Sequence, residues 1–258
     1  MKNNMHDYHI KKSIIKELSI LDLKLKYRNS ILGFLWSFLE PLLLLTVLYF
    51  VFSNIFQSTI EQFPLYLLLG IIMWNMVVRG TTMSVNSIVT RGGLLTQMYV
   101  PRIVFPISAT VTSLIMLGFD LIIFFILMVA LQFIPPVTIL LLPIIIAITF
   151  FLVLGISLPL SVLNVYYRDV QFIWGIVIHA GFFVVPIFYT FDMLPENIRE
   201  LVRLNPTAQL IEMAHNVTLY GVLPSYHDIL YTIGVTSLIF FVGYFIFRKM
   251  QSRIVEEF

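Results

Sequence analysis

Six long apolar stretches alternate with shorter polar segments along the 258 residues of the chain. A transmembrane helix needs about 20 mainly apolar residues to cross a hydrocarbon layer of about 30 Å, and each stretch is near or above that length. Backbone groups in lipid must be paired within a helix or a closed barrel, and the stretches show no period-two alternation. The pattern predicts an all-α integral membrane protein, a single domain of six transmembrane helices over 1–258. The predicted spans are about 35–57, 63–88, 103–131, 137–163, 171–190 and 229–247.

Positive charges are strongly biased to one side of this layout. With the N-terminus inside, thirteen lysines and arginines fall in inner segments and only Arg199 and Arg203 in outer ones. Cytoplasmic loops of membrane proteins carry the excess of such residues. We therefore expect a multi-pass protein of the cytoplasmic membrane with both termini in the cytoplasm. The inner positive residues are Lys2, Lys11, Lys12, Lys16, Lys24, Lys26, Arg28, Arg91, Arg102, Arg168, Arg248, Lys249 and Arg253.

Two segments outside the spans have helical patterns of their own. In the N-terminal segment 1–34, the residues from Ser13 to Arg28 place apolar side chains on one face and lysines opposite, which predicts an amphipathic helix in the membrane interface. A second interpretation is a charged tail that only sets orientation. In the outer segment 191–228, Pro195 suits the start of a helix, Asn205-Pro206 breaks it, and a second amphipathic stretch follows. We expect two short re-entrant helices there rather than a plain surface loop.

Three ionisable residues lie inside the apolar stretches: Glu40, Arg79 and Asp120. Charges within a membrane are costly and usually face a protein interior or a water-filled path. Glu40 and Arg79 are also near enough to span ends to reach the interface, whereas Asp120 is in mid-span. The three are dispersed along the sequence, which does not favour a proton relay.

Composition excludes several classes of function. The chain is 59% hydrophobic and 12% charged, and its net charge of +2 is too small to indicate binding of nucleic acid. It lacks cysteine, and its five histidines show no metal-ligand spacing, so we expect no metal site and no catalytic residues. A P-loop is also missing from the sequence. We therefore do not expect an enzyme, and if material moves through this protein its energy must come from a partner.

Four ordered segments resemble one family. They are Tyr27 through Leu42, Gly92 through Pro101-Arg102, Asn164 through Val170, and Pro186 through Tyr189 running into Leu204-Asn205-Pro206. Together they are similar to ABC-2-type permeases that export O-antigen, capsular polysaccharide or teichoic acid. The resemblance covers nearly the whole chain, and Glu40 before Pro41 is its one visible departure.

The resemblance implies a permease formed by a homodimer of this chain, with two copies of a separate subunit that binds ATP and its magnesium ion. The implied substrate is a lipid-linked glycan. It also implies contact with membrane lipids and a role at the exit for Pro195, Asn205 and Pro206. The N-terminal helix and the loop around 91–102 would contact the ATPase or gate the inner mouth. The residues assigned in this way to ATPase coupling or the inner gate are Tyr27, Arg28, Gly33, Arg91, Gly92, Pro101, Arg102, Tyr167, Arg168 and Asp169.

Some side chains have two readings. Arg168 and Asp169 suit a hinge or a headgroup gate, or else Asp169 caps a helix while Arg168 anchors it at the phosphates. Aromatic residues near span ends suit stacking against sugar rings, or an ordinary interfacial belt. With Arg79, these candidates for the channel are Trp36, Tyr49, Trp74, Tyr99, Trp174 and Tyr189. Alternative functions are an ABC-2 permease for a drug or lipid, and a membrane enzyme or scaffold.

Overall fold

The computed structural model describes residues 2–26, 28, 30–54, 60–93 and 100–251, and this part of the chain is built of helices without a strand. The prediction of an all-α fold is therefore confirmed for the described residues. The helices are α1 (Lys2–Lys26), α2 (Trp36–Asn54), α3 (Phe63–Ser87), α5 (Val104–Ala130), α6 (Leu142–Tyr166), α7 (Val170–Val184), α8 (Glu196–Arg203), α9 (Pro206–His215) and α10 (Tyr226–Met250). Short helical turns are η1 (Gly33–Leu35), η2 (Val89–Arg91), η3 (Val137–Leu141), η4 (Phe191–Met193) and η5 (Asn216–Tyr220).

Within the described residues, five helices are long and apolar enough to cross a membrane. They are Trp36–Asn54, Phe63–Ser87, Val104–Ala130, Val137–Tyr166 and Tyr226–Met250. The sixth predicted span, 171–190, is not confirmed, because α7 has 15 residues and is therefore about 22 Å long. It ends at Val184 because Val185 precedes Pro186 and is extended, with φ −89° and ψ 148°.

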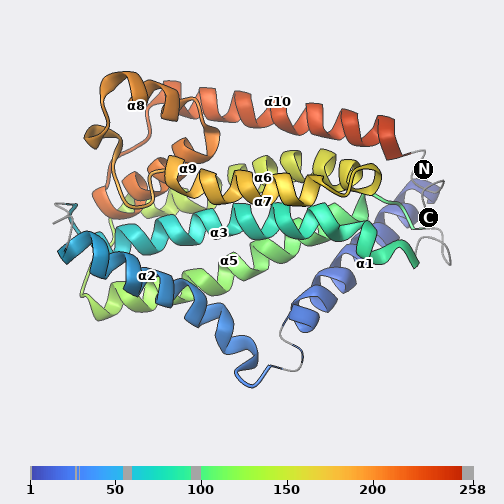
Figure 1. The fold of residues 1–258 in the computed structure, drawn as a ribbon, viewed down its shortest axis with the longest axis horizontal. Helices are drawn as coiled ribbons and strands as arrows, with labels where there is room; N and C mark the ends of the chain where they lie inside the picture. Colours follow the sequence, from blue (N-terminus) through green and yellow to red (C-terminus); the bar gives the residue numbers. More distant parts are fainter. Residues whose placement is uncertain (1, 27, 29, 55–59, 94–99, 252–258) are drawn as a thin grey trace.

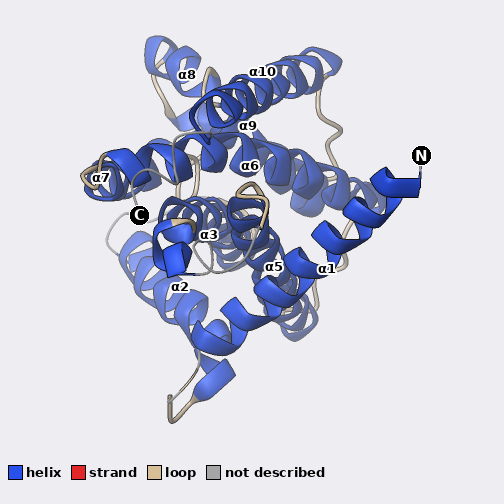
Figure 2. Ribbon diagram, turned by 90° about the vertical axis from the view of Figure 1, so that its right-hand side faces the viewer, coloured by secondary structure: helices blue, strands red, loops and turns tan. Residues whose placement is uncertain are grey.

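Helix α3 forms the centre of the bundle. Its residues from Leu65 to Met73 are fully buried, and α2, α5, α6, α7 and α9 pack around it. Figure 2 shows α3 end-on, with α2, α5, α6 and α7 around it. Because other helices cover α3 on all sides, α3 is the scaffold of the fold.

Helices α6 and α10 approach closely through two glycines. A Cβ atom added at Gly155 would lie 2.7 Å from the Cα of Phe240, and one at Gly243 would overlap the carbonyl of Gly155. Small residues at such a contact let two backbones come together in a membrane.

The two ends of the bundle differ (Figure 1). Helix α1 begins and α10 ends at one end, here called the termini end, while α8 and α9 lie at the other, the α8–α9 end. The predicted pair of outer helices is present: the side chain of Asn205 accepts a 2.9 Å hydrogen bond from the Thr207 amide, which caps α9 after the break. Helix α9 is almost wholly buried, whereas α8 is largely exposed.

Helix α1 packs obliquely on α5, and the chain then turns back into α2, so that α1 and α2 form a V in Figure 1. The predicted apolar face of α1 is covered only in part, because Leu18 is buried, as is Ser19 beside it, whereas Leu21 and Leu25 are 44% and 50% exposed. The Ser19 hydroxyl donates a 3.0 Å hydrogen bond to the carbonyl of Ser108 in α5. Helix α1 is therefore docked against α5 around Leu18 and Ser19.

Candidate functional site

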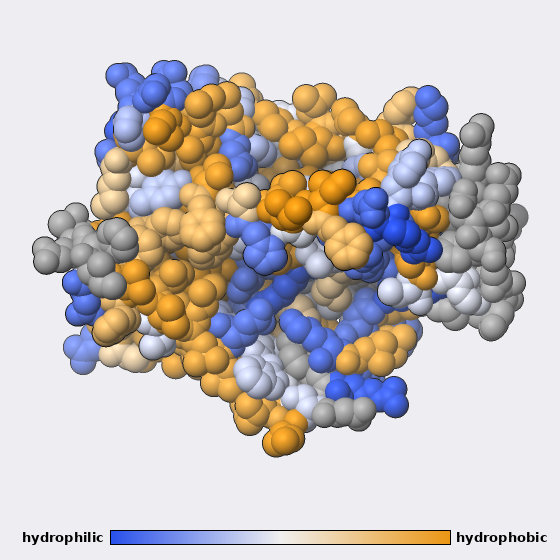
Figure 3. Space-filling view, in the orientation of Figure 1, coloured by the Kyte–Doolittle hydropathy of each residue, from blue (hydrophilic) through white to orange (hydrophobic). Residues whose placement is uncertain are grey.

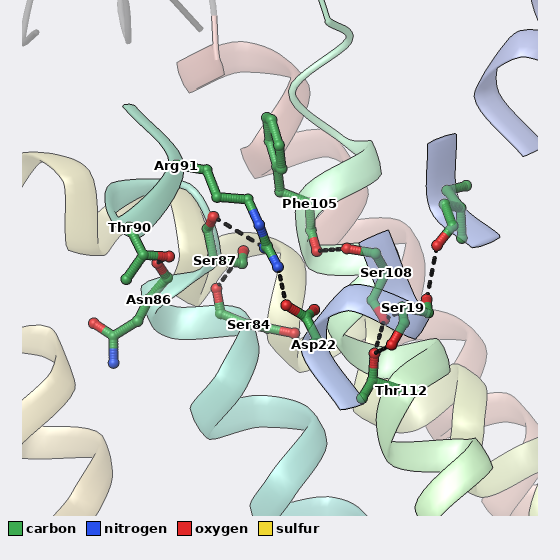
Figure 4. Close-up of polar contacts among 11 residues, drawn as sticks. Ser19, Asp22, Ser84, Asn86, Ser87, Thr90, Arg91, Phe105, Ser108 and Thr112 are labelled. Atoms are coloured by element: carbon green, nitrogen blue, oxygen red, sulfur yellow. Dashed lines mark hydrogen bonds and ion pairs between the residues drawn. The ribbon is translucent and has the colours of Figure 1, made fainter. Parts of the chain in front are cut away.

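An ion pair between Arg91 of η2 and Asp22 of α1 joins the first helix to the bundle at the termini end (Figure 4). Only 13% of the Arg91 side chain and 11% of the Asp22 side chain are exposed. Arg91 also donates a 3.4 Å hydrogen bond to the carbonyl of Ser87, and its guanidinium lies 5.8 Å from the ring centroid of Phe105. Charge-assisted hydrogen bonds of this kind are among the strongest in proteins. We call this pair the Arg91–Asp22 clamp.

Buried hydroxyl groups extend the clamp into α5 and α3. Besides its bond to Ser108, Ser19 lies near Thr112, whose hydroxyl donates to the carbonyls of Ser108 at 2.8 Å and of Ser19 at 3.5 Å. On the other side of α5, the Ser84 hydroxyl donates to the carbonyl of Pro106 over 3.3 Å. Figure 4 shows that these contacts come from three helices. These contacts thus join α1 to η2 and to α5, and α5 to α3.

The other residues predicted for the inner gate are not all next to the clamp. Pro101 and Arg102 accept backbone hydrogen bonds of 3.0 and 3.3 Å that begin α5, and Gly92 ends η2. Gly33 has a φ of 51°, which suits glycine at the turn between α1 and α2. Arg28 is exposed in the same turn. Tyr27 and Tyr99 lie outside the described residues.

The link between α6 and α7 presents Tyr167, Arg168 and Asp169 to the surface, and all three are exposed. Asp169 stands at the N-cap position of α7, as one of its two interpretations expects, but its side chain makes no capping hydrogen bond. The motif does contain a buried anchor that the sequence did not single out. Asn164 donates to the Val85 carbonyl over 3.1 Å and to the Asn86 side chain over 3.2 Å, which fastens α6 to α3.

The three charges predicted within the spans meet at one place. Arg79 of α3 donates to Asp120 of α5 over 2.7 Å and to Glu40 of α2 over 3.2 Å. The Lys26 ammonium of α1 lies 4.0 Å from the same Glu40 oxygen. The view of these charges as dispersed is therefore wrong, because four helices bring them together. We call Lys26, Glu40, Arg79 and Asp120 the charged cluster.

Exposure differs sharply across the charged cluster. Asp120 is 1% and Arg79 9% exposed, whereas 55% of the Glu40 side chain is exposed. Figure 3 shows hydrophilic atoms in the lower middle of an otherwise largely apolar face, between α2 and α1. An exposed carboxylate within a membrane span is costly unless water or other polar groups face it. The surface beside Glu40 is therefore suited to a polar environment rather than to lipid.

The aromatic candidates separate into two groups. Trp74 and Trp174 lie between α3 and α7: the Trp174 indole donates to the Thr81 hydroxyl over 2.9 Å, and the Trp74 ring packs against Gly181. These two side chains hold α7 to the scaffold. Trp36 and Tyr49 are instead 44% and 43% exposed on α2. The Tyr189 hydroxyl donates to the Val184 carbonyl.

A cavity of about 250 Å³ opens at the α8–α9 end, lined by Phe191, Arg203, Gln209 and Glu212 among others. Burial raises the pKa of the Glu212 carboxyl to about 7; the Asp192 carboxylate adds to the rise, and the Arg203 guanidinium opposes it. Sequence reasoning missed Glu212, since nothing in the pattern of α9 shows that the position is enclosed. Pro195 and Asn205-Pro206 act at this end as the starts of α8 and α9.

His215 is the second buried titratable group of α9 that the sequence did not reveal. Its Nε2 atom lies 2.9 Å from the Tyr66 carbonyl, and its ring stacks on the Tyr66 ring at 3.7 Å between centroids. Burial lowers its pKa to about 3, against a smaller opposing effect of the backbone hydrogen bond. The ring is therefore neutral at physiological pH and joins α9 to α3. In the part of the chain that the structure describes, no group of three or more histidine, aspartate and glutamate side chains is placed to hold a metal ion.

The fold and the buried charges define a polytopic helical membrane protein, and comparison with known proteins places it in a family. Residues 15–219 match the ABC-2 type transporter family. An O-antigen export system permease protein RfbA of Klebsiella pneumoniae is 31% identical over 241 residues, 91% of each chain. RfbA of Myxococcus xanthus is 27% identical over 92% of each chain, and the polysialic acid transport protein KpsM of Escherichia coli is 22% identical over 97% of this chain and 98% of its own. The chain belongs to the ABC-2 type transporter family, which confirms the resemblance seen in the four segments.

Proposed function

We propose that this chain is the permease subunit of an ABC transporter that exports a polysaccharide. The observation that carries the proposal is the full-length similarity to permeases named for O-antigen export, at 31% identity over 91% of each chain. The more distant similarity to a polysialic acid transport protein extends over nearly the whole chain and supports the same substrate class.

The proposed assembly is a homodimer of this chain with two copies of a separate ATP-binding subunit. The absence of a P-loop from the sequence supports the placing of ATP and its magnesium ion on that partner. The substrate is a lipid-linked glycan, as the resemblance implies. In a homodimer, the second copy would also cover surfaces of α2 and α10 that are exposed in a single copy.

The proposed topology has six crossings of the cytoplasmic membrane, with the termini end in the cytoplasm. Helix α7 is too short to cross alone, so the sixth crossing is completed by the segment after Val184. Helices α8 and α9 form the re-entrant element, which the burial of α9 within the bundle supports. Helix α1 lies in the inner interface, and its lysines support that position.

The Arg91–Asp22 clamp is the proposed point of coupling to the ATPase. It joins α1 to the end of α3, and Arg91 begins the loop around 91–102, to which the resemblance assigns contact with the ATPase or gating of the inner mouth. The exposed Tyr167–Asp169 link adds a second surface at the same end of the bundle. Movement of the ATP-binding subunits would then displace α1 and η2 as a unit.

The proposed glycan path runs past the charged cluster along α2. Glu40 has an exposed carboxylate, and Trp36 lies one helical turn away on the same face, so this face offers both a hydrogen-bond acceptor and an aromatic surface. A hydroxyl-rich polymer needs polar contacts across the membrane, and a path through lipid would not supply them. This face of α2 is therefore the best-suited lining of a path in the described residues.

The proposal is tested by purification of the tagged chain together with its cognate ATP-binding subunit and reconstitution into proteoliposomes. We expect a stable complex whose ATPase activity rises with a polyprenyl-linked glycan and stays at its basal level with the polyprenyl lipid alone. Equal stimulation by the glycan-free lipid would favour an ABC-2 permease for lipids or drugs. Failure of the chain to form any complex with the ATPase would contradict the proposal altogether.

A further inference from the structure

A groove of about 470 Å³ lies between α1 and α5 on the termini side of the bundle. Its floor consists of the apolar side chains Ile15, Ile20, Val111 and Ile115, and its rim carries Lys12 and Lys16. The two lysines are one helical turn apart on α1, and both are exposed. The groove thus combines an elongated apolar floor with a paired positive rim.

The lysines lie toward the termini end of this groove. Successive turns of α1 meet successive turns of α5, because Ser19 contacts Ser108 while Lys26 reaches Met116. Lys12 and Lys16 precede Ser19 on α1, and they therefore point back toward the termini end, whereas Ile115 lies deeper along α5. Among the described residues, no carboxylate pairs with either ammonium group.

We propose that this groove binds one anionic phospholipid of the inner leaflet, with its phosphate between Lys12 and Lys16 and an acyl chain on the apolar floor. The phosphate would pair with the two lysines, and the acyl chain would cover the apolar floor. Basic residues close to a membrane attract anionic headgroups, and apolar side chains at that depth are stabilised by hydrocarbon. An acidic protein surface would pair with the lysines but would leave the apolar floor uncovered.

This inference does not depend on the transported substrate. A lipid bound in the groove would contact both α1 and α5 close to the Arg91–Asp22 clamp. Its binding would therefore stabilise the packing of α1 on α5. The phospholipid is accordingly a structural ligand of the permease rather than its cargo.

The test is lipid binding to the purified full-length permease, measured by native mass spectrometry during titration with phosphatidylglycerol or phosphatidylcholine. We expect one phosphatidylglycerol to be retained preferentially. Each of Lys12→Gln and Lys16→Gln should weaken its binding roughly fivefold, the fold-change that corresponds to about 1 kcal/mol per basic residue near an anionic surface. The matched controls are Lys11→Gln and Lys24→Gln, which alter exposed lysines of α1 outside the groove.

A second variant tests the apolar floor without a change of charge. Ile115→Trp fills the groove and should abolish retention of phosphatidylglycerol, while the helical circular dichroism and the complex with the ATP-binding subunit stay intact. Equal weakening by the Lys11 and Lys24 controls, or no preference for phosphatidylglycerol, would show annular lipid only and overturn the proposal. So would loss of the ATP-binding subunit in the Lys12 and Lys16 variants with lipid retention unchanged, because the rim would then be a protein interface.

Discussion

The guanidinium of Arg79 donates a 2.7 Å hydrogen bond to the carboxylate of Asp120, and both side chains are almost completely buried between α3 and α5. The pair is not fully satisfied, since Arg79 Nε and Asp120 Oδ1 have no hydrogen-bond partner in the described part of the chain. A buried ion pair need not stabilise a fold relative to an apolar pair, but the loss of one partner leaves the other charge uncompensated. The third member, Glu40, is the exposed one.

Replacement of Asp120 by Leu should lower the free energy of unfolding by about 3–5 kcal/mol, because Arg79 would remain buried with only the exposed Glu40 as a nearby carboxylate. The combined variant Arg79→Met with Asp120→Leu should recover most of that loss. Thermal unfolding in detergent micelles measures both. A double variant no more stable than Asp120→Leu would show that the pair contributes through something other than charge compensation.

A cysteine at position 40 should react with a membrane-impermeant thiol reagent, because the proposed path brings water to this face of α2. The chain contains no cysteine, so Glu40→Cys provides a single reactive thiol. The matched control is Leu238→Cys in the middle of α10, which is 63% exposed on a helix with no charged residue nearby. Labelling of intact reconstituted transporter, with and without ATP, gives the two rates. Equal and slow labelling at both positions would place Glu40 against lipid or protein.

Asp22→Asn should uncouple ATP hydrolysis from export without dissociation of the ATP-binding subunit. The substitution removes the charge that holds Arg91, and a buried charge-assisted hydrogen bond is worth about 1.5–3 kcal/mol. We expect export to fall several-fold while the basal ATPase rate is kept. The exchange variant Asp22→Arg with Arg91→Asp should restore part of the export. If export in Asp22→Asn equals that of the wild type, the clamp does not transmit the movement.

Much of the fold follows from apolar length and charge bias, and what does not follow has identifiable reasons. The run 171–190 is apolar throughout, so its hydropathy predicts a full span. The helix nevertheless ends at Val184, because Pro186 follows. Glu40, Arg79 and Asp120 were each recognised as costly, but a sequence gives only their approximate depth. The three charges meet because α2, α3 and α5 are neighbours and are rotated so that these side chains face one another. Glu212 and His215 were missed for the same reason, since their enclosure depends on how α9 docks against α3.

Gly243→Ala should destabilise the contact between α6 and α10, because the new methyl group would overlap the Gly155 carbonyl, which belongs to rigid backbone. Forced overpacking of this kind typically costs about 1–3 kcal/mol. The matched control is Gly234→Ala on the same helix, where an added Cβ meets nothing within 4 Å. Thermal unfolding of the two variants should separate them clearly. A lowered melting temperature in the control alone would contradict the close packing at Gly155.

Glu212 should make the stability of the protein fall as pH rises from about 4.5 to 7. Its pKa is raised by burial from 4.5 to about 7, so the folded protein binds a proton that the unfolded chain releases in this range. The stabilisation is greatest at low pH and is lost as the carboxyl ionises. Its upper limit is about 3 kcal/mol, at about 1.4 kcal/mol for each pH unit of the shift. The Asp192 carboxylate raises the pKa of this carboxyl further, and the Arg203 guanidinium lowers it.

Protonation of His215 makes stability change with pH in the opposite direction. The experiment therefore has to separate the contributions of His215 and Glu212. The folded His215 pKa of about 3 lies below the ordinary value of 6.5, so the unfolded chain takes up a proton as pH falls through 6.5 and stability drops. Melting temperatures of the wild type and Glu212→Gln, measured between pH 5 and 8, share this contribution, and their difference isolates the Glu212 carboxyl. We expect the variant to lose relative stability at pH 5 and gain it at pH 8, whereas the exposed control Glu196→Gln should follow the wild type. Parallel profiles for Glu212→Gln and the wild type would show that the carboxyl is solvated in the folded protein.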